Sequence, residues 1–185
     1  RHIEALDAML RRLASGGAAR PRPKARKPRW VPALASLYSQ VPLRQELSYL
    51  SIGERCNANG SKRFRELQAA GDWDGCVAVG REQVAEGSHT LDVCTAYVGR
   101  NEVADMTAVI TRMRGEVNAP LVLDSTEFPV LEASVKLYGG KPVINSINFE
   151  DGEEPAAKRL ALAKKFGCAV IALTIEEEGM AKTAE

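Results

Sequence analysis

Histidine, metal-binding cysteine pairs and long apolar runs are scarce or absent in this 185-residue sequence. Only two histidines occur, His2 and His89, so we expect neither a Ser-His-Asp triad nor a histidine metal cluster. The four cysteines lack CxxC spacing, which argues against a closed zinc site or a disulfide framework. No segment approaches the roughly 20 apolar residues of a membrane span, and the opening residues do not have the plan of a signal peptide. We therefore expect a cytoplasmic location and reduced, buried cysteines.

Acidic residues are missing from one basic segment of the chain. The net charge is only +1, yet eight lysines and arginines lie between residues 11 and 29, interrupted by three prolines. Such a segment cannot build a core, and it is either a solvated, extended linker or a nucleic-acid tether. We favour the linker and expect no nucleic-acid partner, because no aromatic stacking platform or basic helix face accompanies the charges.

The segment before these prolines has the apolar spacing of a helix. Its apolar residues are Ile3, Leu6, Met9, Leu10 and Leu13, and a pair of glycines follows. Because a proline-rich spacer comes next, we expect the apolar stripe to face a domain that precedes this sequence. The expected organisation is a terminal helix over residues 1–15, a linker over residues 16–48 and a folded domain over residues 49–185.

From residue 49 onward, short β-branched apolar runs alternate with longer helical segments. The expected strands cover residues 49–53, 90–94, 121–123, 143–146 and 169–174. The expected helices cover residues 62–70, 73–86, 102–114, 130–137 and 155–166, with Asp72 as the N-cap of the second. Strands that alternate with helices predict a parallel sheet, either an open doubly wound sheet or a closed barrel.

Polar residues at the strand ends favour the barrel. Four of the five expected strands end close to an acidic or amide side chain, as the convergent loops of a barrel active site require. A Rossmann sheet would place a glycine-rich turn after its first strand, and residues 53–57 do not match GxGxxG. We predict an α/β fold, a (β/α)8 TIM-type barrel. Five strands cannot close it, so we expect only the first five or so βα units of a longer protein.

Four polar residues at these strand ends are candidate ligand contacts. Asp124 can accept hydrogen bonds from the ring N–H groups of a heterocycle, or it can cap the following helix. The amide of Asn145 both donates and accepts, so it can read the mixed edge of a pterin or another nucleobase-like ring, or it ties down a loop. Asp92 is a ligand contact or a strand-end bracket. Asn57 is expected to contact the ligand, whereas Asn59, which precedes a glycine, has the sequence of a turn.

Three consecutive glutamates, Glu176, Glu177 and Glu178, follow the fifth expected strand. They lie at the same end of the sheet as the candidate contacts and could form a metal or proton site. We favour a solvated loop instead and expect no metal in this sequence. The scarcity of histidine indicates a module that binds and polarises its ligand rather than one that attacks it.

Four stretches carry a specific resemblance to a known family. They are IGERCNANGSK at residues 52–62, LDVC at 91–94, LDST at 123–126 and INS at 144–146. In this order and spacing they resemble the folate-binding domain of cobalamin-dependent methionine synthases, and the resemblance extends over residues 41–185. Residues 1–13 resemble the last helix of the homocysteine-binding domain that precedes it in this family.

This resemblance implies a barrel that binds 5-methyltetrahydrofolate and presents its methyl group to cob(I)alamin in methionine synthesis from homocysteine. Asn57, Asp124 and Asn145 match positions that contact the pterin, and Asp92 lies near them. Further site residues of the family, an acidic residue and an asparagine, fall beyond Glu185. The catalytic residues are therefore partly unknown, and this fragment alone is expected to be inactive. Cobalamin, zinc and the homocysteine-binding and cobalamin-binding domains are expected in other parts of the same protein.

The sequence departs from the family pattern at two cysteines. Cys56 stands where many relatives have threonine, and Cys94 stands where asparagine is common. Two related barrel enzymes remain as alternatives, a dihydropteroate synthase and a corrinoid iron–sulfur protein methyltransferase. A non-catalytic linker or docking module is the third.

Overall fold

The computed structural model describes residues 1–16, 25, 27 and 30–180, in two compact units, Arg1–Trp30 and Val31–Glu185. Residues 17–24, 26, 28 and 29 of the predicted basic linker therefore lie outside the described residues. The first unit contains one helix, α1 (His2–Ala14), as the apolar spacing predicts. Its apolar stripe is exposed at four residues, Ile3, Leu6, Met9 and Leu10. Among the described residues, no helix is both long and apolar enough to cross a bilayer.

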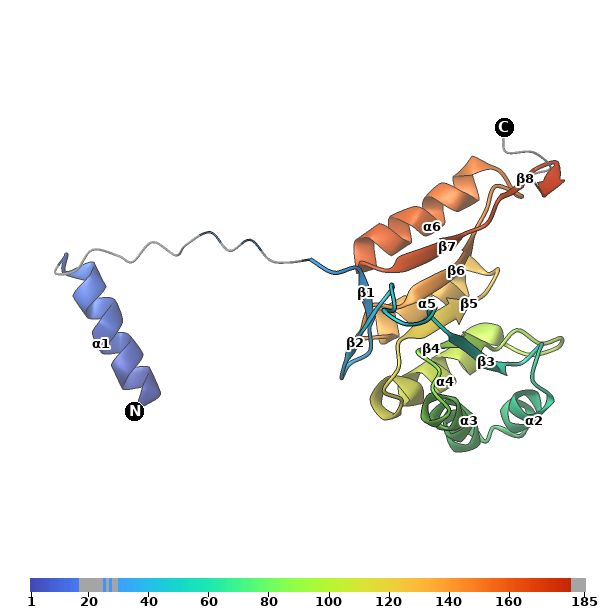
Figure 1. The fold of residues 1–185 in the computed structure, drawn as a ribbon, viewed down its shortest axis with the longest axis horizontal. Helices are drawn as coiled ribbons and strands as arrows, with labels where there is room; N and C mark the ends of the chain where they lie inside the picture. The colour runs from blue at the N-terminus through green and yellow to red at the C-terminus, as the bar shows by residue number, and fades with distance from the viewer. Residues whose placement is uncertain (17–24, 26, 28–29, 181–185) are drawn as a thin grey trace. The chain divides into compact units, whose positions relative to one another are not determined.

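The second unit is built on a five-stranded parallel sheet. Its strands are β3 (Ile52–Asn57), β4 (Thr90–Cys94), β5 (Leu121–Asp124), β6 (Val143–Ile147) and β7 (Ala169–Ala172). Its helices are α2 (Lys62–Ala70), α3 (Trp73–Ala85), α4 (Glu102–Glu116), α5 (Phe128–Leu137) and α6 (Glu153–Phe166). Each strand pairs with the next one along the chain, in the order β3-β4-β5-β6-β7 (Figure 1). A doubly wound sheet would reverse direction at a switch point, so this order confirms the predicted partial barrel.

Helix ends in this unit follow local capping chemistry. The side chains of Ser61, Asp72 and Asn101 each accept a hydrogen bond from a backbone N–H of the first turn of α2, α3 and α4. Asp72 was the predicted N-cap of its helix. Gly71 and Gly167 close α2 and α6 at φ of 70° and 71°, a region that glycine adopts without a Cβ clash.

One strand prediction was wrong in the residues that it assigned to the strand. The first strand of the sheet covers Ile52–Asn57, not residues 49–53, and Tyr49 is largely exposed. The prediction followed the apolar residues, whereas backbone pairing with β4 resumes at Cys56, beyond the polar Glu54 and Arg55. A register shift between Gly53 and Cys56 accommodates these two residues. As a result, Asn57 lies inside the strand rather than after it.

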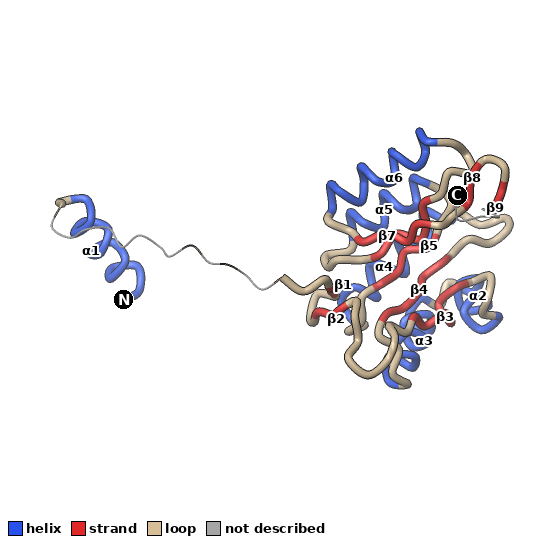
Figure 2. The backbone as a smooth tube through the Cα atoms, turned by 45° about the horizontal axis from the view of Figure 1, so that its top comes forward, coloured by secondary structure: helices blue, strands red, loops and turns tan. Residues whose placement is uncertain are grey.

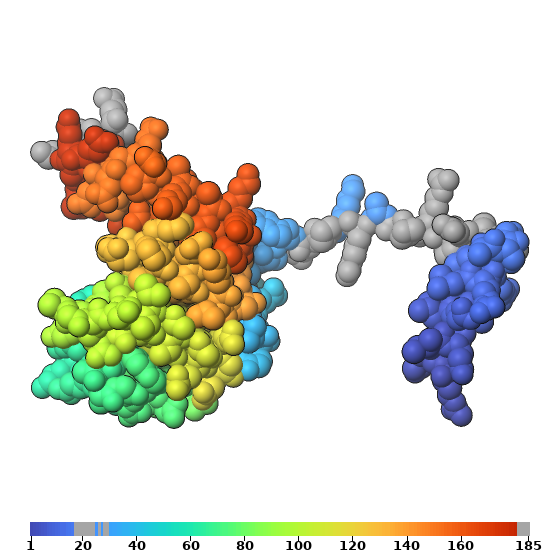
Figure 3. All heavy atoms as spheres, turned by 180° about the vertical axis from the view of Figure 1, so that it is seen from behind, coloured from blue at the N-terminus to red at the C-terminus, as the bar shows by residue number. Residues whose placement is uncertain are grey.

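Alternation along the strands separates an outer face from an inner face. Leu121 and Leu123 of β5 belong to the large core that the helices cover, whereas Val122 belongs to a smaller cluster on the opposite side. The helices follow one another along the sheet in chain order (Figure 2). Figure 3 shows this helix-covered side, with the colours running in sequence order from α3 to α6. The inner face is the one opposite the helices, and it lines the interior of the partial barrel.

A short antiparallel hairpin, β1 (Ala33–Ala35) and β2 (Gln40–Pro42), lies within the segment that the sequence assigned to the linker. Leu34 is fully buried in the inner cluster with Val122 and Val143. Ala35 pairs with Lys141 just before β6, so the hairpin covers the N-terminal end of the strands. A Cβ at residue 140 would lie 2.1 Å from the carbonyl oxygen of Ala35, which explains the glycine there.

The fully buried position of Leu34 predicts a large effect of its truncation. We expect Leu34→Ala to lower the free energy of unfolding by about 2–5 kcal/mol, because the hairpin cannot collapse to fill the space. Urea titration followed by tryptophan fluorescence would measure it. Leu47→Ala, at a fully exposed side chain of the same segment, should stay within about 0.5 kcal/mol. Equal effects of the two changes would contradict the conclusion that the hairpin fills the inner face at the N-terminal end of the strands.

Two further strands, β8 (Ile175–Glu176) and β9 (Gly179–Met180), form a second hairpin after β7. Gly179 has a φ of +102°, which a turn of this length demands and side chains with a Cβ rarely adopt. Of the three glutamates predicted as a loop, Glu176 thus ends β8, and Glu177 and Glu178 form the turn of the hairpin. Its residues line a separate cavity that is described below.

Candidate functional site

Strand alternation places the candidate contacts on the inner face of the sheet. Leu91 and Val93 of β4 pack outward into the helix-covered core, so Asp92 and Cys94 point inward. In the same way Leu123 and Ile144 pack outward, which turns Asp124 and Asn145 inward. Parallel pairing aligns Asn57 with Cys94 and Asp124 with Asn145, at the C-terminal ends of the strands.

Asn57 connects the carboxylates of this cluster. Its Nδ2 donates to Asp92 Oδ2 at 3.0 Å and to Asp124 Oδ2 at 3.1 Å. Its Oδ1 accepts the backbone N–H of Asn59 at 2.9 Å, within the turn that leads to α2. Carboxylates only accept and a backbone N–H only donates, so these partners fix which way the amide points. The turn predicted at Asn59 therefore also orients Asn57.

Asn145 completes the cluster from β6. Its Nδ2 lies 3.4 Å from Asp92 Oδ1, so Asp92 accepts from amides on both sides. Asp92 is 1% exposed, and these two donors offset part of the free energy that its burial requires. The structure thus brings together all four residues that the sequence singled out, Asn57, Asp92, Asp124 and Asn145. Their role as ligand contacts stays a prediction.

The capping role that the sequence left open for Asp124 is excluded by the start of α5. Glu127 occupies the N-cap position of that helix, and no side chain caps it. The N–H of Glu127 instead donates to Ser125 Oγ at 3.0 Å. Asp124 is half-buried and faces the cluster, which leaves its remaining acceptor capacity for a ligand.

Burial raises the pKa values of the carboxyl groups in this cluster. The pKa of Asp92 rises from an ordinary 3.8 to about 6, mainly through burial, with Asn57 opposing the rise and the charge of Asp124 adding to it. Burial also raises the pKa of Asp124. The pKa of Glu54 is raised by burial and then by the charge of Asp124. Three carboxyl groups therefore share one end of the sheet and hold protons more tightly than they would in water.

Two cavities adjoin the cluster. One of about 320 Å³ is lined by Asp124, Asn145, the loops that follow β5 and β6, and Arg159 of α6. Another of about 670 Å³ lies along β3 and the turn before α2, and it includes Glu54 and Asn57. These volumes match those of small-molecule sites. The lining of the first cavity is mostly polar, which suits a ligand with many hydrogen-bonding atoms.

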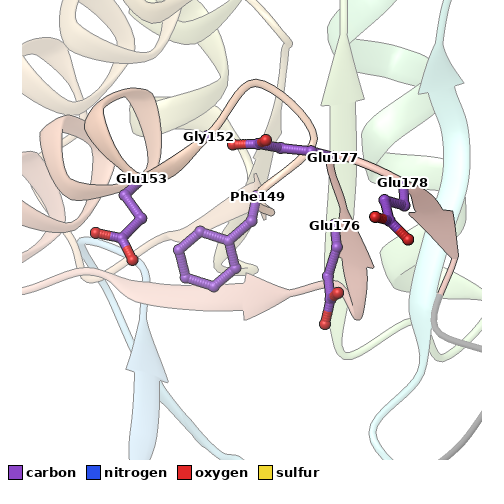
Figure 4. A pocket seen from close by; sticks show the side chains of 6 residues that line it. All are labelled: Phe149, Gly152, Glu153, Glu176, Glu177 and Glu178. Atoms are coloured by element: carbon purple, nitrogen blue, oxygen red, sulfur yellow. The ribbon is translucent and has the colours of Figure 1, made fainter.

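A third cavity, of about 370 Å³, lies between the loop after β6 and the β8–β9 hairpin (Figure 4). Its lining consists of Phe149, Gly152, Glu153, Glu176, Glu177 and Glu178. The carboxylates around it include the three glutamates that the sequence analysis considered as a metal or proton site. Within the described part of the chain, no group of three His, Cys, Asp or Glu residues is arranged to hold a metal ion.

Sequence reasoning missed two members of the inner cluster, Glu54 and Cys94. Cys94 could have been found, because it lies two residues after Asp92 on the same strand and must share its face. Glu54 could not, because its orientation depends on the register shift in β3. The outward-facing Cys56, by contrast, is buried under α3 and receives a hydrogen bond from Gln83.

Comparison with known proteins agrees with this geometry. The family described as pterin binding enzyme matches residues 53–185, which include the whole cluster. The chain belongs to the pterin binding enzyme family. It is 46% identical over 181 residues to a methionine synthase of Mycobacterium tuberculosis, a match that covers 96% of the chain and 15% of that protein. It is 48% identical over 159 residues to a methionine synthase of Mycobacterium leprae, covering 84% of the chain and 13% of that protein.

These similarities confirm the resemblance to methionine synthases that the four motifs indicated. The chain spans about one seventh of the length of these relatives. The pterin-binding match begins at Gly53, close to the start of β3 and after the β1–β2 hairpin. The hairpin is nevertheless part of the same compact unit as the pterin-binding sheet.

The raised pKa of Asp92 predicts a specific pH dependence of stability. A carboxyl that binds its proton with a pKa of about 6 when folded and about 3.8 when unfolded stabilises the fold only while it is protonated. That contribution, about 3 kcal/mol, is complete below pH 3.8 and is lost as the pH rises to about 6. We expect the stability of the wild type relative to Asp92→Asn to fall over this interval and to level off above it. Urea titrations of both proteins from pH 4 to 8 would measure this, and a constant difference would contradict it.

Proposed function

We propose that this chain is the part of a cobalamin-dependent methionine synthase that binds 5-methyltetrahydrofolate and presents its methyl group for transfer. The observation that supports this most directly is the hydrogen-bonded cluster of Asn57, Asp92, Asp124 and Asn145 on the inner face of a pterin-binding fold. A pterin edge alternates N–H donors with acceptors, and the cluster offers carboxylate acceptors beside amides that both donate and accept.

The positions of these residues in the sheet support a division of roles among them. We propose that Asp124 accepts from ring N–H groups in the polar cavity and that Asn145, beside it on β6, reads the neighbouring atoms of the ring. Both residues line that cavity. Asp92 lies deeper, at 1% exposure, and Asn57 links the two carboxylates. A flat ring in the polar cavity would therefore contact Asp124 and Asn145, while Asp92 and Asn57 hold the cluster together behind them.

The chemistry of the reaction explains why carboxyl groups with raised pKa values are useful here. A methyl group on a tertiary amine leaves poorly unless the nitrogen gains positive character as the methyl is attacked. Glu54 and Asp92 both hold protons more tightly than isolated carboxyl groups. We propose that Glu54, which lines the cavity beside Asn57, supplies or relays the proton that this nitrogen needs.

Cobalamin would supply the nucleophile for this transfer from another domain. The described residues contain no metal-ligating group of His, Cys, Asp and Glu side chains, and we place cobalamin and the zinc of the homocysteine site on other domains of the full-length protein. The methyltransferase activity then requires those domains, as well as site residues beyond Glu185. A cytoplasmic location is part of this proposal.

The N-terminal segment fits the same assignment. We propose that residues 1–15 are the last helix of a preceding homocysteine-binding domain. The exposed apolar stripe of α1 supports this, because Ile3 is 84% exposed and Leu6, Met9 and Leu10 are each 53% exposed. No residue of α1 is buried, so the stripe is available for another domain to cover.

Removal of the predicted ring contacts tests the binding proposal. In the full-length protein, Asp124→Ala and Asn145→Ala should each weaken the affinity for 5-methyltetrahydrofolate by roughly ten-fold or more, because each leaves ring groups unpaired. Isothermal titration calorimetry would measure the dissociation constants. Asp74→Ala, at an exposed side chain of α3, should bind as the wild type does. Unchanged affinity in both site variants would favour a docking module over a binding module.

A second experiment separates the role of Glu54 from ligand binding. Glu54→Gln should slow single-turnover methyl transfer to cob(I)alamin by about 100-fold, in the range of general acid catalysis, while the dissociation constant for the folate stays within about two-fold. Stopped-flow absorbance of cob(I)alamin would follow the transfer. Glu66→Gln, on the exposed surface of α2, is the matched control. If Glu54→Gln transferred the methyl group at the wild-type rate, the proton role would have to be assigned elsewhere.

A further inference from the structure

Cys94 lies in the middle of the inner cluster, although its residue type suggests no role in binding. It is the last residue of β4 and is 3% exposed. Its partner on β3 is Asn57, and the register of β4 with β5 places Asp124 on the other side of it. Strand alternation turns its side chain to the same face as Asp92. A thiol therefore stands between two of the polar residues that form the site.

The contacts of this thiol are polar on both sides. The register that pairs Val93 with Leu123 places the thiol of Cys94 beside the carboxylate of Asp124, on the same face of the sheet. Its sulfur lies 3.8 Å from Nδ2 of Asn59, which donates to it from the turn before α2. The backbone carbonyl of Cys94 accepts the N–H of Ala58 at 2.9 Å, which ties the same turn to β4. Cys94 thus connects the turn after β3 with the carboxylate at the end of β5.

The protonation state of Cys94 suits a hydrogen-bond donor. Burial raises the pKa of its thiol to about 12, and the nearby charge of Asp124 acts in the same direction. At neutral pH the group is therefore a neutral thiol with one proton to donate. A thiolate beside Asp124 and Asp92 would be repelled by both, which also excludes Cys94 as a nucleophile toward the methyl group.

We propose that Cys94 is a positioning residue that fixes the Asp124 carboxylate in the orientation that receives the ligand. Asp124 accepts a hydrogen bond from Asn57 on β3. The neighbouring thiol of Cys94 on β4 is placed to donate a second one, and the two donors together would restrict rotation of the carboxylate. Its remaining lone pairs then face the polar cavity that it shares with Asn145. This inference rests on the proposed function, because it takes the ligand of that cavity to be the pterin.

Variants of Cys94 in the full-length protein test the proposal. Cys94→Ala removes the donor and should weaken the affinity for 5-methyltetrahydrofolate roughly ten-fold, as the loss of a hydrogen bond to a charged group does. Cys94→Ser keeps an O–H donor at the same place and should restore the affinity to within about three-fold of the wild type. Cys76→Ala is the matched control, since Cys76 is equally buried but lies in α3, and its affinity should not change.

A spectroscopic measurement on the ligand-free protein separates this inference from the proposed function. The infrared S–H band of Cys94, assigned by its loss in Cys94→Ala, should lie at lower frequency than the band of Cys76. In Asp124→Ala it should move to higher frequency, because the acceptor is gone. An S–H band whose frequency does not change in Asp124→Ala would overturn the inference. A Cys94→Ser variant that binds the folate as weakly as Cys94→Ala would overturn it as well. Absence of folate binding by the wild type would instead sink the proposed function, while the band still decides the thiol–carboxylate bond.

Discussion

The site depends on the two hydrogen bonds that Asn57 donates from one amide nitrogen to Asp92 and Asp124. Carboxylates on neighbouring strands repel each other when both are charged, and burial increases the free energy of that repulsion. An amide donor between them offsets part of it. The turn after β3 orients this amide through its oxygen, so a local backbone feature decides whether two distant acidic residues can share one face of the sheet.

The two ends of the strands differ in how the inner face is filled. At the N-terminal end, Leu34 of the β1–β2 hairpin packs on Val122 and Val143 and excludes water by apolar contact. At the C-terminal end the inward side chains include Asn57, Asp92, Asp124 and Asn145, and the two amides donate hydrogen bonds to the two carboxylates. One strand can serve both ends, because Val122 and Asp124 of β5 point to the same side and lie two residues apart.

Stability and function act against each other in this cluster. The raised pKa of Asp92 means that its ionised form is unfavourable in the folded protein at neutral pH. The apolar core beneath the helices, in which Leu91, Leu121 and Ile144 are fully buried, stabilises the fold and offsets the free energy of burying this carboxyl group. Burial makes the ionised carboxylates of Asp92 and Asp124 less favourable. A ligand that brings N–H donors to them would offset this, and the offset would add to its affinity.

The sequence by itself determined the alternation of strands and helices, the sequential parallel sheet and the four polar residues at the strand ends. These features follow from local patterns: β-branched runs, Asp72 as a cap, and acidic or amide residues directly after apolar ones. Tertiary structure alone decided the register shift in β3, the inward placement of Glu54 and the packing of Leu34 under the sheet. Strand pairing with β4 extends past Glu54 and Arg55 although both are polar. The short apolar run around Leu34 does not by itself indicate that it packs against the sheet. Contacts between residues far apart in the chain leave no periodic trace in the sequence, which is why the hydrogen bond between Asn57 and Asp124 became visible only in the folded protein.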